Sequence, residues 1–156
     1  MLVEDVLQTL DFKIESLKAD IKVDTLPKAY VNKSQIRQLF QNLVSNSLKF
    51  SRADVDPKIR ISYEFITDLR VTSTKLQKAP GYHKITLKDN GIGFDNIFAD
   101  KIFNIFQRLN GRSEYEGTGI GLSICKKILE NHGGIISAIG ELNKGAVFTI
   151  VLPDVS

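Results

Sequence analysis

Apolar residues recur at helical spacing in three stretches of the chain. These stretches run from about Val3 to Lys18, from Lys33 to about Phe50, and from Gly121 to about His132. A stripe that repeats every three or four residues is typical of a helix with one buried face. Asn32, followed by Gln35 three residues later, supplies a capping box for the second stretch. The pattern therefore predicts three amphipathic helices.

Alternating apolar and polar residues predict a sheet. Residues Lys58 to Ile66 and Tyr82 to Asp89 alternate along their length, as half-buried strands do. Ile135 to Ile139 and Ala146 to Leu152 flank a turn sequence and indicate a hairpin. Shorter strand-like runs lie at residues 21–23 and 29–31. The order of the elements predicts a two-layer α/β (α+β) sandwich, with a mixed, largely antiparallel sheet and helices on one face.

Two polar segments interrupt this pattern. Residues 67–81 contain Pro80 and Gly81 and indicate an insertion or a long hairpin loop. Residues 95–117 begin with one or two short helical turns and end in a charged stretch. Because this second segment lies between two glycine clusters, we expect it to form a mobile lid. Arg108 at the root of the lid either reaches a terminal phosphate or lies on the surface.

Length and composition indicate one soluble domain. A chain of 156 residues is long enough to bury a core, and its 42% hydrophobic and 25% charged content is ordinary. The net charge of +3 is scattered, so nucleic acid is not an expected partner. The single cysteine, Cys125, excludes a disulfide framework and fits a reducing compartment such as the cytoplasm. No apolar run could span a membrane, and we expect no direct membrane contact.

The two glycine clusters carry the clearest chemical signal. Asp89 to Phe94 contains Gly91 and Gly93 at the end of a predicted strand, and Gly117 to Leu122 leads into the last helix. Glycines before a helix let the backbone approach a ligand and leave N–H groups to hold phosphate oxygens. Two such clusters, the first headed by a carboxylate, suggest a nucleotide held between a buried acid and a helix N-terminus.

Asp89 is the candidate acid. It shares one face of its strand with Ile85 and Leu87, so the alternation turns its carboxylate inward. A buried carboxylate needs a donor, which the exocyclic amine of adenine supplies. Guanine offers a carbonyl oxygen at that point and would be rejected. The alternative is that Asp89 simply opens a turn with Asn90 and Gly91.

Asn42, Asn46 and Lys49 form the second candidate group. At about 100° per residue they fall within roughly 60° of one another on the second helix. An asparagine oxygen is a hard neutral ligand suited to Mg²⁺, which also binds substrate phosphates, and a lysine one turn on suits phosphate charge. The alternative is that these three residues are only the solvated side of the helix.

Other familiar motifs do not fit the chain. The glycines from Gly117 to Gly121 follow the predicted lid rather than the first strand of a βαβ unit, which excludes a dinucleotide fingerprint. No Gly-Lys-Ser/Thr sequence of a P-loop occurs. His83 and His132 are isolated, so neither belongs to a metal-ligand spacing or to a recognisable nucleophile triad.

Four separated segments together resemble the sensor histidine kinases. Gln41 to Phe50 resembles their N box, Asp89 to Phe94 their G1 box, Ile102 to Arg108 their F box, and Gly117 to Leu122 their G2 box. The order and spacing match, and the resemblance covers nearly the whole chain, 1–156, as a single catalytic ATP-binding domain. It implies the Bergerat fold shared with gyrase-, Hsp90- and MutL-type ATPases. The Phe-Gln-Arg-Leu sequence at 106–109, followed by Glu-Tyr-Glu-Gly at 114–117, looks most like phytochrome-related and hybrid kinases.

The resemblance implies roles for the matching positions. Asn46 would coordinate Mg²⁺ with help from Asn42, Lys49 would contact phosphate, and Asp89 would bind the adenine amine. Asn46, Lys49 and Arg108 would be the catalytic set. Phe103 and Phe106 would anchor the lid. The implied ATP-binding positions are Asn42, Asn46, Lys49, Phe50, Asp89, Gly91, Ile92, Gly93, Phe103, Phe106, Gly117, Thr118, Gly119, Ile120, Gly121 and Leu122.

Position 42 separates kinases from hydrolysing relatives within this superfamily. Gyrase- and Hsp90-like ATPases carry a glutamate there that activates water, whereas Asn42 cannot act as a general base. We therefore expect transfer of the γ-phosphoryl group of Mg-ATP to a histidine, with hydrolysis, or a non-catalytic interaction module of the same fold, as the alternatives.

The resemblance also predicts the partners of the chain. The sequences after His83 and His132 lack the pattern of a phosphoacceptor histidine, so we expect a fragment that cannot phosphorylate itself. The expected partners are the dimerisation and histidine-phosphotransfer domain of the same parent protein and a response-regulator receiver domain. The fragment is expected to be monomeric and the parent homodimeric.

Overall fold

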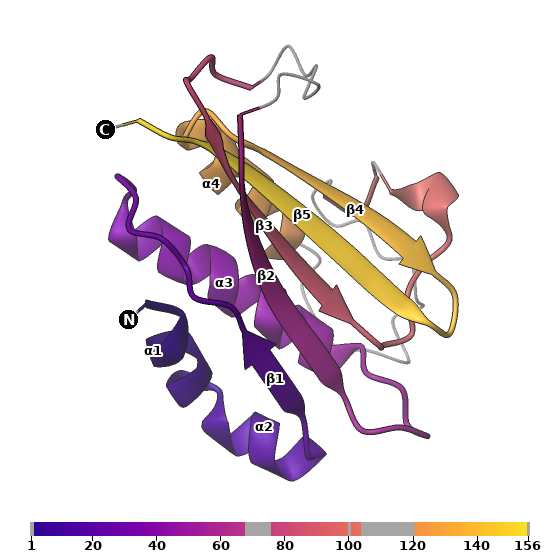
Figure 1. Cartoon of the computed structure of the whole chain (residues 1–156). Coiled ribbons are helices and arrows are strands. Elements are labelled where there is room, and N and C mark those ends of the chain that lie inside the picture. The colour runs from indigo at the N-terminus through magenta and orange to yellow at the C-terminus, as the bar shows by residue number, and fades with distance from the viewer. Residues whose placement is uncertain (1, 68–75, 100, 104–120, 156) are drawn as a thin grey trace.

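The computed structural model describes residues 2–67, 76–99, 101–103 and 121–155. One five-stranded sheet has its helices packed on one face (Figure 1). The helices are α1 (Leu2–Thr9), α2 (Asp11–Leu17), α3 (Lys33–Lys49) and α4 (Gly121–Asn131), with short 3₁₀ turns η1 (Asn96–Phe98) and η2 (Lys101–Phe103). The strands are β1 (Asp20–Val23), β2 (Lys58–Ile66), β3 (Tyr82–Asp89), β4 (Ile135–Glu141) and β5 (Gly145–Pro153). The predicted α/β fold with a mixed sheet is confirmed.

The sheet has the strand order β1-β2-β3-β5-β4. β1 runs parallel to β2, and the other three pairings are antiparallel. Asp89, the last residue of β3, lies opposite Ile59 of β2 on one side and Ala146 of β5 on the other. β3 is the central strand, and this register places its C-terminal end between the first residues of β2 and β5.

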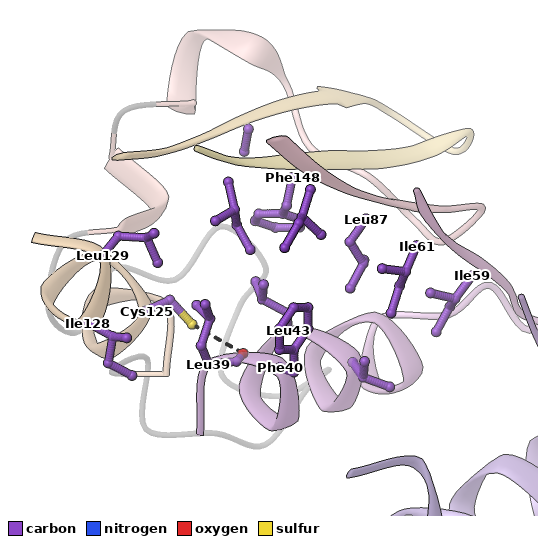
Figure 2. Packing of buried hydrophobic residues seen from close by; sticks show 14 of the residues in the cluster. Leu39, Phe40, Leu43, Ile59, Ile61, Leu87, Cys125, Ile128, Leu129 and Phe148 are labelled. Atoms are coloured by element: carbon purple, nitrogen blue, oxygen red, sulfur yellow. Dashed lines mark hydrogen bonds between the residues drawn. The ribbon is translucent and has the colours of Figure 1, made fainter. Parts of the chain in front are cut away.

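The core lies between the sheet and the helices α3 and α4 (Figure 2). Leu39 and Leu43 of α3 point toward the sheet, where Leu87 of β3 and Phe148 of β5 point back at them. All four side chains are buried. Burial of a leucine-sized side chain contributes about 1.5–3 kcal/mol, so this layer fixes α3 against β3 and therefore positions the polar residues that both elements carry.

The first predicted helix is divided in two. The single helix expected over residues 3–18 is interrupted at Leu10, between α1 and α2. The Thr9 hydroxyl donates to the carbonyl oxygen of Asp5 at 3.0 Å, a back-bond that bends helices. The bend lets α1 bury Val3 and Val6 against α3, whereas Phe12 of α2 stays exposed.

The strand predicted at residues 29–31 does not form, so that prediction is wrong. This segment leads instead to Asn32, whose N–H donates to Nε2 of His132 at 3.0 Å. Asn32 also caps α3 as predicted, because its side-chain oxygen accepts from the N–H of Gln35. The segment is thereby tied to the C-terminal end of α4 rather than to the sheet.

Part of the predicted insertion, residues 76–81, is described. The N–H of Gln77 donates to the carbonyl oxygen of Gly133 at 2.9 Å, and the Tyr82 hydroxyl donates to the carbonyl oxygen of Gln77 at 3.1 Å. Leu76 is buried with Tyr82 and Val151 in a small second cluster. The returning arm of the insertion therefore packs on the start of β3 and the end of β5, and it reaches the turn between α4 and β4.

Candidate nucleotide-binding site

Among the described residues, three donors hold the carboxylate of Asp89. Its Oδ2 accepts from the Ser47 hydroxyl at 2.8 Å. Its Oδ1 accepts from the N–H groups of Gly91 at 2.9 Å and Ala146 at 3.2 Å. Burial raises the pKa of Asp89 above its ordinary value, and these three hydrogen bonds oppose that increase. A carboxylate is thus kept at the edge of the core by neutral donors from α3, from the loop after β3 and from β5.

The loop that follows Asp89 is attached to the end of α3. The N–H of Ile92 donates to the carbonyl oxygen of Phe50 at 2.9 Å. A Cβ added to Gly91 would lie 2.6 Å from the same oxygen, so only glycine fits there. The Arg52 side chain donates to the carbonyl oxygen of Asn90 at 2.9 Å. The first glycine cluster and the predicted N box are therefore in contact.

The same loop is held from its other side by the hairpin of β4 and β5. The N–H of Asn143 in the hairpin turn donates to the carbonyl oxygen of Ile92 at 2.7 Å. Gly93 has a φ of 63°, and an added Cβ would lie 2.1 Å from the carbonyl oxygen of Glu141. Three residues after Gly93, the side-chain oxygen of Asn96 accepts from the N–H of Gly140 at 2.7 Å. The loop is consequently fixed between two elements that are far apart in sequence.

The predicted polar stripe of α3 lies on the side of the helix that faces the start of α4. Asn42 and Asn46 are half-buried, and Lys49 is exposed with its Nζ 5.5 Å from the centre of the Phe50 ring. The Asn42 side-chain amide donates to the carbonyl oxygen of Gly121 at 3.3 Å. This contact brings the predicted N box to the first residue of α4, where the second glycine cluster ends.

The structure brings the described candidates together from four segments. They come from the end of α3, from the end of β3 with the loop that follows it, from η2 and from the start of α4. Leu122 packs against the main core. Phe103 is buried and meets Phe148 edge to face at 6.3 Å, which suits an anchoring role. The candidates that lie outside the described residues are Phe106, Arg108, Gly117, Thr118, Gly119 and Ile120.

Sequence reasoning missed Ser47 and Asn96. Ser47 lies one helical turn after Leu43 on the buried face of α3 and is only 3% exposed. A polar side chain on an apolar stripe needs a partner, and this was the signal that could have found it. Asn96 is exposed and follows an apolar loop, so nothing in the sequence pattern indicates that its side chain bonds to Gly140.

Both histidines have structural partners. His83 is buried, with Nδ1 2.8 Å from the Tyr63 hydroxyl and Nε2 3.2 Å from a carboxylate oxygen of Asp154. His132 follows α4, where its Nδ1 lies 2.8 Å from the carbonyl oxygen of Ile128 and must carry the proton. Across the described ranges, no group of three His, Cys, Asp or Glu side chains could hold a metal ion, and no helix is long and apolar enough to cross a bilayer.

Comparison with known proteins identifies the family. Residues 31–156 match the family described as histidine kinase-, DNA gyrase B-, and HSP90-like ATPase. Cyanobacterial phytochrome A of Nostoc sp. is 41% identical over 150 residues, which cover 96% of this chain and 18% of the phytochrome. Adaptive-response sensory kinase SasA of Synechococcus sp. is 34% identical over 97% of this chain and 36% of the kinase. The chain therefore spans a minor part of these relatives.

Solved structures agree with the sequence comparison. The catalytic domain of histidine kinase ThkA has a TM-score of 0.73 and 27% identity, over 98% of this chain and 90% of that one. The mycobacterial sensor histidine kinase MprB, at 20% identity, shares the fold with a TM-score of 0.76 over 98% of this chain and 92% of that one. The predicted resemblance to phytochrome-related kinases is confirmed. The chain belongs to the histidine kinase-, DNA gyrase B- and HSP90-like ATPase family, as a catalytic domain of the histidine kinase type.

Proposed function

We propose that this domain binds Mg-ATP between α3 and the two glycine clusters and positions its γ-phosphoryl group for transfer to a histidine on a separate dimerisation domain. The observation that carries this proposal is the carboxylate of Asp89, which is half-buried and held by neutral donors beside the α3 polar stripe. A carboxylate has about four acceptor positions, so one held by three donors can still accept a hydrogen bond from a ligand.

Adenine suits Asp89 better than guanine does. The exocyclic amine of adenine donates a hydrogen bond, whereas the guanine carbonyl at the same ring position would face the carboxylate with a second acceptor. An unmatched pair of acceptors in a buried site costs about 1–3 kcal/mol. We therefore expect selectivity for adenine nucleotides. Gly91 supports this assignment, because an added Cβ there would lie 3.2 Å from Oδ1 of Asp89, so glycine keeps the surroundings of the carboxylate free of a side chain.

The carboxamides of Asn42 and Asn46 fit a magnesium ion that also binds phosphate. They lie one turn apart on the same side of α3, and neutral oxygen ligands suit Mg²⁺ when phosphates supply most of the negative charge. When bound, the ion would neutralise charge on the phosphates. Lys49, one turn further along the helix, would contact a phosphate through its ammonium group. Phe50 would flank the base, and Arg108 and the glycines from Gly117 remain candidates for the phosphates.

Asn42 favours phosphoryl transfer over hydrolysis. Its amide donates to the carbonyl oxygen of Gly121 and has no basic lone pair with which to remove a proton from water. Without a base, the domain would hold ATP until an external nucleophile arrives. We propose that this nucleophile is a histidine on the dimerisation domain of the parent protein. ThkA has been solved in complex with the response regulator protein TrrA, and we propose a receiver domain as the next acceptor here.

Calorimetric titration of the chain with ATP and GTP, with and without Mg²⁺, tests the binding proposal. ATP should bind and GTP should not. Asp89→Asn should weaken ATP and ADP by about tenfold or more, because the amide presents a donor or a weaker acceptor to the amine. Asn46→Ala should lose the magnesium-dependent part of the affinity. Unchanged ADP affinity in Asp89→Asn, or unchanged magnesium dependence in Asn46→Ala, contradicts the corresponding assignment.

A phosphate-release assay separates transfer from hydrolysis. With Mg-ATP alone, the chain should release negligible phosphate. On addition of a separate histidine-bearing dimerisation domain from the parent, radioactive phosphate from the γ-position should appear on that domain as an acid-labile phosphohistidine. Sustained phosphate release without an acceptor would instead assign the chain to the hydrolysing members of its family. Absence of nucleotide binding would favour an interaction module.

A further inference from the structure

Ser47 contributes the one side-chain hydrogen bond to Asp89 that the described residues show. It belongs to α3, lies between Asn46 and Leu48, and is only 3% exposed. Its hydroxyl oxygen is 2.8 Å from Oδ2 of Asp89. Since an ionised carboxylate can only accept, the hydroxyl hydrogen must point at Oδ2. The hydroxyl is therefore committed to Asp89.

The acceptor positions of the carboxylate can be counted. A carboxylate has about four lone-pair positions, two on each oxygen. Oδ1 already accepts from the N–H groups of Gly91 and Ala146, which fills both of its positions. Oδ2 accepts from Ser47, which fills one of its two. As far as the described residues go, a single acceptor position is left, and it lies on the oxygen that Ser47 holds.

We propose that Ser47 is a positioning residue for adenine recognition: its hydroxyl fixes Oδ2 of Asp89 so that this oxygen presents one acceptor position to the amine of the base. The inference rests on the proposed nucleotide binding and adds a residue to it. Ser47 acts through Asp89, because its own side chain is almost fully enclosed and Asp89 is the more exposed of the two.

Loss of the hydroxyl has two consequences that can be measured. The first is weaker binding, because Oδ2 loses the partner that orients it; about a tenfold loss of ADP affinity is expected for a hydrogen bond to a charged group. The second is a change in protonation. The Ser47 hydrogen bond is one of the three interactions that lower the pKa of Asp89 against the effect of burial, so its removal raises that pKa.

The change in protonation alters the pH dependence of ADP affinity, which a purely structural role of Ser47 would leave unchanged. The ionised carboxylate is the form that accepts from the amine, so ADP affinity falls as the pH drops through the pKa of Asp89. In Ser47→Ala this fall begins at a higher pH. The other two donors are backbone N–H groups, which do not titrate. The ratio of wild-type to variant affinity should therefore increase as the pH is lowered from neutral toward the raised pKa of Asp89.

The experiment compares four chains by calorimetric titration with ADP at a series of pH values. They are the unaltered chain, Ser47→Ala, Ser47→Thr and the matched control Ser45→Ala, a half-buried serine two residues earlier on α3. Ser47→Ala should bind about tenfold more weakly at neutral pH and with the shifted pH profile. Ser47→Thr, which keeps the hydroxyl, should restore the profile. Ser45→Ala should match the unaltered chain. All titrations use the same ligand, so protonation of ADP itself cancels in the ratios.

The outcomes distinguish this inference from the proposed function. If the unaltered chain binds ADP and Ser47→Ala binds equally well, the role of Ser47 is refuted while the nucleotide site stands. Weaker binding with an unchanged pH profile also refutes it, because that result would indicate altered packing only. Should Ser47→Ala not fold, Ser47→Cys replaces it, since a thiol is a weak donor of similar size and predicts the same direction of change. If the unaltered chain binds no nucleotide, the proposed function itself is refuted.

Discussion

Replacement of Gly93 by alanine tests how the loop after β3 is fixed. Gly93 has a φ of 63°, in the left-handed region, and it passes close under the tip of the β4–β5 hairpin. A Cβ at this position would lie 2.1 Å from the carbonyl oxygen of Glu141 and 2.6 Å from that of Gly145. Carbon and oxygen atoms that are not bonded do not approach so closely, so the loop or the hairpin must move.

The expected magnitude follows from two contributions. Left-handed backbone costs an alanine about 1–2 kcal/mol relative to glycine. Separation of the loop from the hairpin removes the hydrogen bond from the Asn143 N–H to the Ile92 carbonyl oxygen, which contributes about 1 kcal/mol. The free energy of unfolding should fall by about 2–3 kcal/mol in total. A domain with about 5–15 kcal/mol of stability would lose a large fraction of it but would remain folded at room temperature.

Urea unfolding followed by circular dichroism measures this change, and Gly121→Ala is the matched control. A Cβ on Gly121 would meet no atom of the described residues within 4 Å, so the unfolding free energy of this variant should stay within about 0.5 kcal/mol of the unaltered chain. A Gly93→Ala chain as stable as the control would refute the reasoning. Gly93→Ala should also bind ADP more weakly, because the loop carries Gly91, whose N–H holds Asp89.

Three further predictions concern Asn96, Cys125 and Asp89. Asn96→Ala should lower the free energy of unfolding by about 1–3 kcal/mol in urea titrations, because the buried N–H of Gly140 loses its acceptor. Asn96→Asp keeps the oxygen, and equal losses in both variants would contradict this. Burial raises the pKa of Cys125 to about 12, so a thiol reagent at about pH 8 should modify the urea-unfolded chain far faster than the native one; equal rates would contradict it. Because the pKa of Asp89 is raised above 3.8 in the fold, the free energy of unfolding of the unaltered chain should decrease as the pH rises from 3.8 to that raised pKa. At neutral pH and without nucleotide, Asp89→Asn should therefore be at least as stable as the unaltered chain. A less stable Asp89→Asn in urea unfolding at neutral pH would count against it.

The sequence predicted the elements whose pattern is strong. Strands β2 and β3 have the predicted bounds, and α3 ends within one residue of its predicted limit. In these segments the apolar residues repeat with the period of the element that forms, and the face that they define is the one buried in the core. The hairpin of β4 and β5 was predicted with shorter strands, because Gly140 and Gly145 at its tip carry no side chain from which alternation can be recognised.

The contacts that depend on distant segments could not be predicted. Asn96 and Gly140 are 44 residues apart, and Ser47 and Asp89 are 42 apart. A sequence pattern gives the face on which a residue lies but not the atom that it meets on another element. The bend at Leu10 is of the same kind, since a threonine within a helix signals a back-bond only after its rotamer is known. The candidate residues could be named from the sequence, and a buried serine such as Ser47 could be recognised as needing a partner, but the partner itself could not be predicted.

Asp89 shows why the positioning donors are neutral. Burial disfavours its charge, and a lysine or arginine beside it would oppose that effect more strongly than hydroxyl and backbone N–H groups do. Such a cation would also occupy the remaining acceptor position on Oδ2 and would compete with the neutral amine of adenine. The donors that the described residues supply hold the carboxylate in place and occupy all but one of its acceptor positions, which is the position that we propose for the amine of the base. Nucleotide binding should then stabilise the fold in proportion to the logarithm of ligand concentration, as linkage requires.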